Sequence, residues 1–216
     1  LLISNASNHG NIGFNAIDLS YSDFSSSTKG ATGSYSFATG YQTIASGTNS
    51  TAIGEGTEAS GNRTLASGYQ TIASGNRSTA IGNTTTSSGY SSTAMGNGTI
   101  AIGNSSTATG YQTIASGTNS IAMGNSTTAS GATSAAMGIN TTAFGEYSTA
   151  MGNGTTASDF VSLVIGQHNL SGSTTTNSAT EFNTANTAFV IGNGTSGSSR
   201  SDAFKVLFNG NTTATG

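Results

Sequence analysis

The sequence is poor in charge and contains no proline, cysteine or tryptophan. Only 6% of its 216 residues are charged, and the formal net charge is −3 at pH 7. The absence of cysteine excludes disulfides and thiolate metal sites. So few basic residues exclude a nucleic-acid-binding surface, and no apolar run is long enough to span a bilayer. We therefore expect no cofactor, no nucleic-acid partner and no membrane insertion of this segment.

What the sequence does contain is a glycine at every seventh position from Gly33 to Gly152. The series is broken at Asp159 and returns at Gly166, and alanine stands two residues before nearly every glycine, with Ser87 as the one substitution in the run. A fixed short period is typical of a solenoid, in which each repeat stacks on the previous one. This periodicity predicts an ordered, repetitive protein and argues against an enzyme.

The true repeat is fourteen residues, because the residue before each glycine alternates in character. In one phase it is aliphatic, except at Thr39, Ser67 and Thr109, and the aliphatic members are Ile53, Ile81, Met95, Met123, Met137, Met151 and Ile165. In the other phase it is serine from Ser46 to Ser158, except at Ile102 and Phe144. We therefore predict an all-β solenoid whose coils each contain two short strands in different environments.

Side chains of a strand alternate between its two faces. If alanine points inward, both strands place only alanine in the interior, and glycine supplies the positive φ that a turn every seven residues requires. The isoleucine and methionine stripe then points outward. Because long exposed apolar stripes mark interfaces, we expect identical chains to pack these stripes around a common axis.

Two segments, STAIGNTTTSSGYSSTAMGNGTIAIGNSSTATG and TNSIAMGNSTTASGATSAAMG, resemble the head repeats of the YadA-like trimeric autotransporter adhesins. The resemblance covers residues 31–166. It implies a left-handed parallel β-roll that forms a homotrimer, with the aliphatic stripe from Ile53 to Ile165 as the trimer seam. The GYQTIASG variant also resembles repeats in fibre and adhesin proteins of marine Bacteroidetes and their phages.

The family resemblance implies a non-enzymatic fibre or adhesin head that attaches to a glycan or protein receptor on a host cell surface. Its location would be extracellular, on a cell surface or on the fibre of a virion or injection particle. An alternative function is ice binding by a flat threonine-bearing face. The outward threonines of the serine phase are interrupted at Ile44, Glu58, Ile72, Ile100 and Ile114, which counts against that alternative.

Four segments are expected along the chain. Residues 1–30 lack the period and should cap the first coil, and residues 31–166 should form the β-roll. Residues 167–187 read as a polar loop insertion across which the repeat register is lost, since Gly192 follows Gly166 by twenty-six residues. Residues 188–216 should form closing strands, and the resemblance implies a stalk or chaperone domain beyond them. The start, which has neither methionine nor a signal peptide, suggests a processed chain or a piece of a longer one.

One edge of the roll is a candidate binding surface, formed by Tyr41, Tyr69 and Tyr111 in turns and by Arg63 and Arg77 fourteen residues apart. We interpret the tyrosines as local repacking where the stripe lapses, with a glycan-binding edge as the alternative. The two arginines could hold an anion, but we favour solvated side chains opposite Glu55 or Glu58. His9 and His168 are expected to be solvated loop residues, because neither has an acidic or thiol partner at catalytic or metal-ligand spacing.

Overall fold

The computed structural model describes residues 9–170 and 178–215, and these residues form strands and turns with no helix. The chain divides into two compact units, residues 1–105 and residues 106–216. The parts of the cap, loop and closing segments at residues 1–8, 171–177 and 216 lie outside the described residues.

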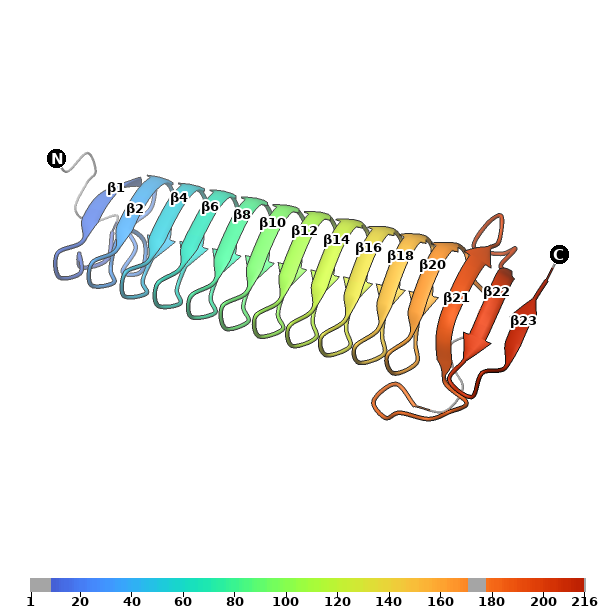
Figure 1. Ribbon diagram of the computed structural model, residues 1–216. Helices are drawn as coiled ribbons and strands as arrows, with labels where there is room; N and C mark the ends of the chain where they lie inside the picture. The colour runs from blue at the N-terminus through green and yellow to red at the C-terminus, as the bar shows by residue number, and fades with distance from the viewer. Residues whose placement is uncertain (1–8, 171–177, 216) are drawn as a thin grey trace. The chain divides into compact units, whose positions relative to one another are not determined.

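In the first unit, parallel strands of five residues form a sheet that we call the first sheet, ordered as in the chain (Figure 1). Its strands are β1 (Ile17–Tyr21), β2 (Phe37–Tyr41), β4 (Thr51–Glu55), β6 (Leu65–Tyr69), β8 (Thr79–Asn83) and β10 (Thr93–Asn97). The two-residue strands between them form a second parallel sheet: β3 (Ile44–Ala45), β5 (Glu58–Ala59), β7 (Ile72–Ala73), β9 (Thr86–Ser87) and β11 (Ile100–Ala101).

The pairing register shows a repeat of fourteen residues in both sheets. In the first sheet Ala52 pairs with Ala66 and Ala66 with Ala80, and in the second sheet Ala59 pairs with Ala73. Each coil therefore contributes one long and one short strand, and the predicted β-solenoid of fourteen-residue coils with two strands each is confirmed.

The second unit repeats this arrangement and adds an antiparallel end. Its first-sheet strands are β12 (Thr107–Tyr111), β14 (Ile121–Asn125), β16 (Ala135–Ile139), β18 (Thr149–Asn153), β20 (Leu163–Gln167), β21 (Thr187–Asn193), β22 (Asp202–Leu207) and β23 (Thr212–Ala214). The second sheet holds β13 (Ile114–Ala115), β15 (Thr128–Ala129), β17 (Thr142–Ala143) and β19 (Thr156–Ala157). Here β22 pairs antiparallel with β21 and with β23.

Alanine fills the interior from both sheets, as the sequence predicts. Every repeat alanine from Ala38 to Ala157 is fully buried. Ser87 takes the alanine position in β9 and is equally buried, with its hydroxyl 2.7 Å from that of Ser92. A side chain of this size lets the two sheets lie close together.

The prediction that alanine alone fills the interior is wrong, because each coil also buries two hydroxyl side chains. Threonine precedes each short strand in a fully buried stack of residues at equivalent coil positions, from Thr43 to Thr155. Serine or threonine precedes each long strand in a second buried stack, from Ser36 to Ser162. Some members of the second stack donate to the carbonyl three residues earlier, as Thr64 does to Gly61 at 2.8 Å.

The repeat glycines are required by close packing between coils more than by the turns. Those of the long strands have φ of 116–129° in β2, β4, β6, β8 and β10 and lie inside the strand. Those of the alternate phase, such as Gly47 and Gly61, do not have positive φ. In both phases an added Cβ would overlap the carbonyl oxygen of the glycine one coil further on, as for Gly82 against Gly96. The prediction that every repeat glycine supplies a positive-φ turn is therefore wrong.

The turn positions with a left-handed backbone conformation are mostly occupied by residues other than glycine. Two stacks of such positions flank the long strands, one including Asn49, Arg63 and Arg77 and the other including Gln42 and Gln70, with φ between 49° and 61°. Their backbone amides donate to the preceding coil, as Arg63 does to Thr48 at 2.8 Å. This coil-to-coil hydrogen bond holds a conformation that costs an ordinary residue free energy.

The break in the glycine series at Asp159 marks the last coil of the second sheet. The backbone carbonyl of Asp159 lies against Gly145, one coil earlier, as a repeat glycine would. The Asp159 carboxylate accepts a hydrogen bond from the backbone amide of Thr187 at 2.7 Å. A side chain replaces the glycine hydrogen at this position and joins the returning loop to the coil. Fully buried Val164 and Val190 take the alanine position in β20 and β21.

The predicted loss of register after Gly166 is wrong for the strands themselves. β21 pairs in parallel with β20, with Val164 opposite Val190 and Gly166 opposite Gly192. The intervening loop therefore takes up the irregular spacing while the ladder continues. At the other end of the chain, β1 pairs with β2 at a separation of twenty residues, from Ile17 to Phe37.

Replacing Gly82 by alanine should lower the free energy of unfolding by more than about 2 kcal/mol, because the new Cβ meets backbone and the φ of 129° is strained. Thermal unfolding followed by circular dichroism measures this. Gly56→Asn is the matched control, since Gln42 and Gln70 occupy the same turn position in the flanking coils. Equal melting temperatures for the two variants would contradict the steric role of Gly82.

Replacing Thr85 by valine should raise the free energy of unfolding by about 1 kcal/mol, because the buried Thr85 hydroxyl has no hydrogen-bond partner within residues 9–170 and 178–215. The same change at Thr64 should instead destabilise, since that hydroxyl donates to Gly61. Chemical denaturation of both variants measures the difference, and a destabilised Thr85→Val would show that this hydroxyl is satisfied.

Candidate binding surfaces

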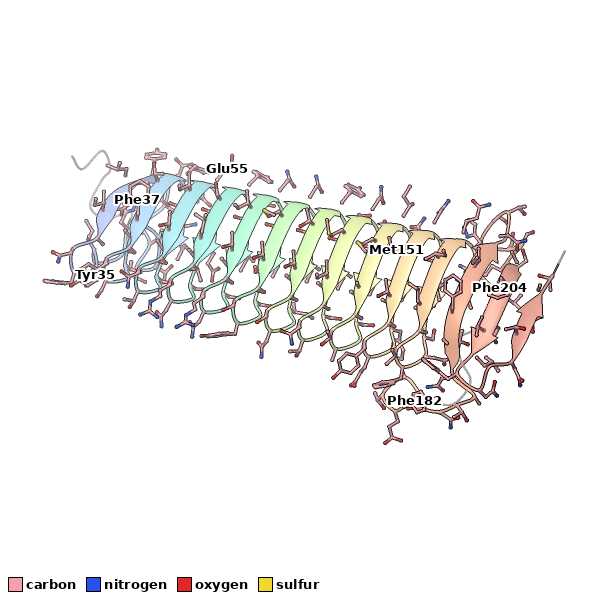
Figure 2. All side chains as sticks on the ribbon, viewed as in Figure 1. Tyr35, Phe37, Glu55, Met151, Phe182 and Phe204 are labelled. Atoms are coloured by element: carbon pink, nitrogen blue, oxygen red, sulfur yellow. The ribbon has the colours of Figure 1, made fainter. Side chains whose placement is uncertain are left out.

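The predicted seam residues point outward from the long strands of the first sheet. In the first unit Ile53, Ile81 and Met95 are 37–38% exposed, and Met95 stacks on Ile81 in the register of β8 and β10. In the second unit Met123 and Met151 are 44% and 40% exposed, while Met137 and Ile165 are half-buried. Met151 is labelled on the face of the first sheet in Figure 2.

The aliphatic stripe is widened by a second outward stack two residues earlier in each long strand. That stack includes Leu65 and Phe37, which are half-buried, and Ile121 and Leu163, which are about two-fifths exposed. The stripe is interrupted at Thr39 and Ser67, which pair with Ile53 on either side. Each unit therefore presents a face of apolar side chains separated by small polar ones.

The three repeat tyrosines lie at the carboxyl ends of long strands, not in the turns where the sequence predicted them. Tyr41 ends β2, Tyr69 ends β6 and Tyr111 ends β12. Tyr69 and Tyr111 are 42% and 47% exposed. Both of these rings are therefore only partly buried within their own chain.

The ends of the long strands that carry Tyr41 and Tyr69, which we call the tyrosine edge, are acidic near the start of the first unit. The Tyr41 hydroxyl donates to the Asp23 carboxylate at 2.5 Å, and the Tyr41 ring stacks on Tyr21 with centroids 6.1 Å apart. Hydrogen bonds from Tyr41 and Tyr21 lower the pKa of Asp23, and the same bond to Asp23 raises the pKa of Tyr41. Glu55 lies between Tyr41 and Tyr69 in the register of the sheet.

The two arginines lie at the other edge of the first sheet, so the predicted single edge of tyrosines and arginines is wrong. Arg63 comes two residues before β6 begins, whereas Tyr69 ends that strand. In Figure 2 the opposite edges are marked by Glu55 and by Tyr35, which occupies the same left-handed turn position as Arg63. Glu55 is therefore not opposite the arginines, and within the described ranges neither arginine forms an ion pair.

Asparagine side chains connect the turns of this arginine edge. Asn62 Oδ1 accepts the Thr48 amide and Asn76 Oδ1 accepts the Asn62 amide, both at 3.0 Å. A shallow pocket of about 230 Å³ is lined by Thr48, Asn49, Asn62 and Arg63. The Arg77 guanidinium carbon lies 5.3 Å from the centroid of the Tyr90 ring, within the range of a cation–π interaction.

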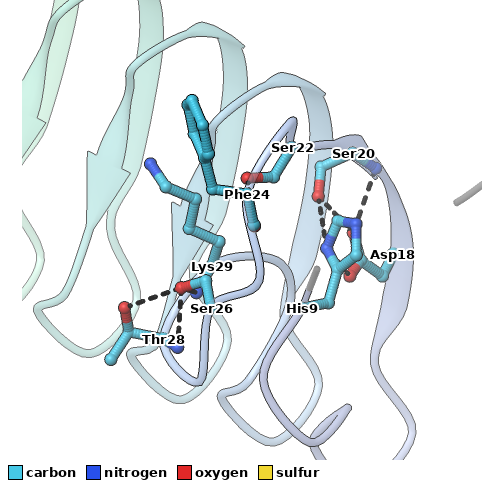
Figure 3. Close-up of polar contacts among 8 residues, drawn as sticks. All are labelled: His9, Asp18, Ser20, Ser22, Phe24, Ser26, Thr28 and Lys29. Carbon is cyan, nitrogen blue, oxygen red and sulfur yellow. Dashed lines mark hydrogen bonds and ion pairs between the residues drawn. The ribbon is translucent and has the colours of Figure 1, made fainter. Parts of the chain in front are cut away.

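His9 is not the solvated loop residue that the sequence predicts. Its side chain is 6% exposed and its Nδ1 lies 3.1 Å from Asp18 Oδ2. Ser20 donates to Asp18 at 2.6 Å and also lies 3.3 Å from the same His9 nitrogen (Figure 3). Serine and aspartate share one ring nitrogen here, so the group lacks the arrangement of a hydrolytic triad, in which they contact opposite nitrogens.

His168 is half-buried, and its backbone bonds to Asn153 and Ser201. Within the described part of the chain, no three histidine, cysteine or acidic side chains lie close enough to hold a metal ion. The same residues include no helix with the length and apolar character needed to cross a membrane.

Sequence reasoning missed three contributors to these edges: the two asparagines, Tyr90, and the pair of Tyr21 with Asp23. The fourteen-residue period gives a signal for the first two. Asn62 and Asn76 stand before the arginines in GNRT and GNRS, fourteen residues apart, so their stacking follows from the period. Tyr90 has the same signal, since it lies fourteen residues after Asn76 at the same coil position. The pair of Tyr21 with Asp23 has none, because Asp23 lies before the periodic region.

Comparison with known proteins gives a result that agrees with the coil geometry. No curated protein matches the chain. The family described as "YadA head domain repeat (2 copies)" matches residues 31–57, 59–85, 73–99, 87–113, 96–118, 101–127, 115–134 and 129–155. These matches cover more than half of the sequence, and the chain therefore belongs to the YadA head domain family, the head repeats of trimeric autotransporter adhesins.

Proposed function

We propose that this chain is the head of a homotrimeric surface fibre that attaches to another cell. The observation that carries the proposal is the apolar stripe on the first sheet, where Ile53, Ile81, Met95, Met123 and Met151 are each more than a third exposed. Such a stripe is typical of a surface buried by association. YadA head domains form homotrimers, and this stripe is the surface that we assign to the seam.

Burial of the stripe also supplies stability that the interior does not. The interior of each coil holds alanine and small hydroxyl side chains, so most of the larger aliphatic side chains lie outside. Completing the burial of one partly exposed isoleucine or methionine contributes on the order of 1 kcal/mol. Repeated along several coils of three chains, this contribution makes association and stability interdependent.

Attachment, not catalysis, is the activity that we assign to the assembled head. The YadA head family is a structural adhesin family and not an enzyme family. In the trimer the first-sheet seam would be covered, and the turns and the second sheet would face outward. We place the head outside the cell, on a cell-surface adhesin or on the fibre of a virion or injection particle, with a glycan or protein on the target cell as its receptor.

Replacing Met123 by aspartate should dissociate the trimer, because each assembled seam would bury three carboxylates against apolar side chains. Light scattering coupled to gel filtration should give about three times the 21.2 kDa chain mass for the unaltered protein and a single chain mass for the variant. Thr128→Asp is the control, since Thr128 belongs to β15 in the second sheet of the same coil. A fully associated Met123→Asp variant would refute the seam.

Ice binding is the alternative function, and we expect none. The outward threonines at Thr128, Thr142 and Thr156 stack in register in the second unit, but in the first unit Ile44, Glu58 and Ile72 take the same position. An exposed Phe144 stands beside this stack. A thermal hysteresis assay at micromolar protein should show no activity, and clear hysteresis would replace adhesion with ice binding as the leading function.

A further inference from the structure

Of the five basic side chains of this protein, two donate hydrogen bonds within the described part of the chain, and two adjacent arginines do not. Lys29 contacts Gln42 through its Nζ atom, at 3.3 Å from the side-chain oxygen, and Arg200 donates to the carbonyls of Gly154 and Asn169. Arg63 and Arg77 instead extend from consecutive turns of the first unit, one coil apart, where both are exposed. No ion pair involves either of them in the described ranges.

The amide groups beside these arginines have a fixed orientation. A backbone N–H can only donate, so the amides of Thr48 and Asn62 require the oxygen atoms of Asn62 and Asn76 as their acceptors. The Nδ2 groups of both asparagines are then left as donors at an exposed edge. Together with the guanidinium groups, they make this edge a surface of hydrogen-bond donors carrying two positive charges.

A donor surface with two uncompensated positive charges matches a ligand with acceptor groups and negative charge. The pocket of about 230 Å³ beside Arg63 is large enough for one anionic substituent with part of its ring. The contact with the Tyr90 ring restrains Arg77, whose fork can then meet a second anionic group one coil away, at a spacing of about 4.8 Å.

We propose that the arginine edge, formed by Thr48, Asn62, Arg63, Asn76, Arg77 and Tyr90, binds an acidic saccharide through its carboxylate or sulfate groups. The inference rests on the proposed adhesive function and names its ligand class. The saccharide hydroxyls match the neutral amide and hydroxyl groups of the edge, and Arg63 and Arg77 bind the anionic substituents. The tyrosine edge, which carries Asp23 and Glu55, repels the same ligand.

A saccharide fits this edge better than a nucleic acid does. Nucleic acids are bound by many basic residues arranged along a phosphate backbone, whereas this edge has two in a chain with a net charge of −3. An acidic saccharide carries charged and neutral hydrogen-bonding groups side by side, and each of the two turns of the edge places one arginine beside one asparagine.

The test is a calorimetric titration of the assembled wild-type protein at low ionic strength with two probes. One probe is a heparin-derived tetrasaccharide, which carries sulfate and carboxylate, and the other is a hyaluronan tetrasaccharide, which carries carboxylate alone. Arg63→Asn with Arg77→Asn should weaken binding of the preferred probe at least about tenfold. Asn49 occupies the same left-handed position with a φ of 56°, so these variants should keep the fold.

The matched control is Lys29→Gln with Lys205→Gln, which removes two positive charges that do not belong to the edge and should leave the affinity unchanged. Tighter binding of the heparin-derived probe would identify sulfate as the bound group, and tighter or equal binding of the hyaluronan probe would identify carboxylate. Three results would overturn the proposal: neither probe binds, the asparagine variant binds like the wild type, or the control loses as much affinity as the asparagine variant. Equal competition by a DNA duplex would also overturn it, since that would show general attraction of polyanions.

Attachment of the labelled head to cultured cells separates failure of this site from failure of the adhesive function. If wild type and the asparagine variant attach equally well, the head is an adhesin but its receptor is not bound at the arginine edge. If the assembled wild type attaches to no cell type while still binding the saccharide, the site stands and the adhesive function fails. Loss of both saccharide binding and attachment in the asparagine variant supports the two together.

Discussion

The backbone of each coil lies against the backbone of the next at the repeat glycines, and there is no room between them for a β-carbon. In the first unit this holds for the glycines inside the long strands, such as Gly54 and Gly68, and for those of the alternate phase, such as Gly47 and Gly61. Any other residue would separate two hydrogen-bonded coils. The contact fixes the register at fourteen residues, and every other stack of side chains in the unit follows from that register.

Close backbone packing also determines how small the interior is. Two sheets separated by alanine leave space for threonine and serine and for no large side chain until Val164 and Val190 at the end of the ladder. Part of the buried surface is therefore hydroxyl, which contributes less stability than the same area of hydrocarbon. The larger aliphatic side chains stand on the outer face of the first sheet, which explains why assembly and stability would be coupled in this protein.

The repeat and the buried alanines could be predicted from the sequence because they are strictly periodic. The position of Tyr41 could not, because Gly40 has a positive φ but remains inside β2, and the turn follows at Gln42. The tyrosines and the arginines lie at opposite ends of the long strands because Tyr69 follows a glycine of the long strand, whereas Arg63 follows a glycine of the alternate phase half a coil earlier. The pairing of His9 with Asp18 and of Asp159 with Thr187 depends on non-periodic segments that return to the coils.

The left-handed turn positions differ from the glycines in one respect that matters for an adhesin. One stack of these positions accepts tyrosine, asparagine, arginine and serine in successive coils of the first unit, and valine at Val161 in the second, all with nearly the same φ. Their side chains leave the roll, and their backbone amides donate to the preceding coil whichever residue is present. Each coil therefore carries one position where different side chains fit the same backbone conformation, so that the outer surface of the roll can vary one turn at a time.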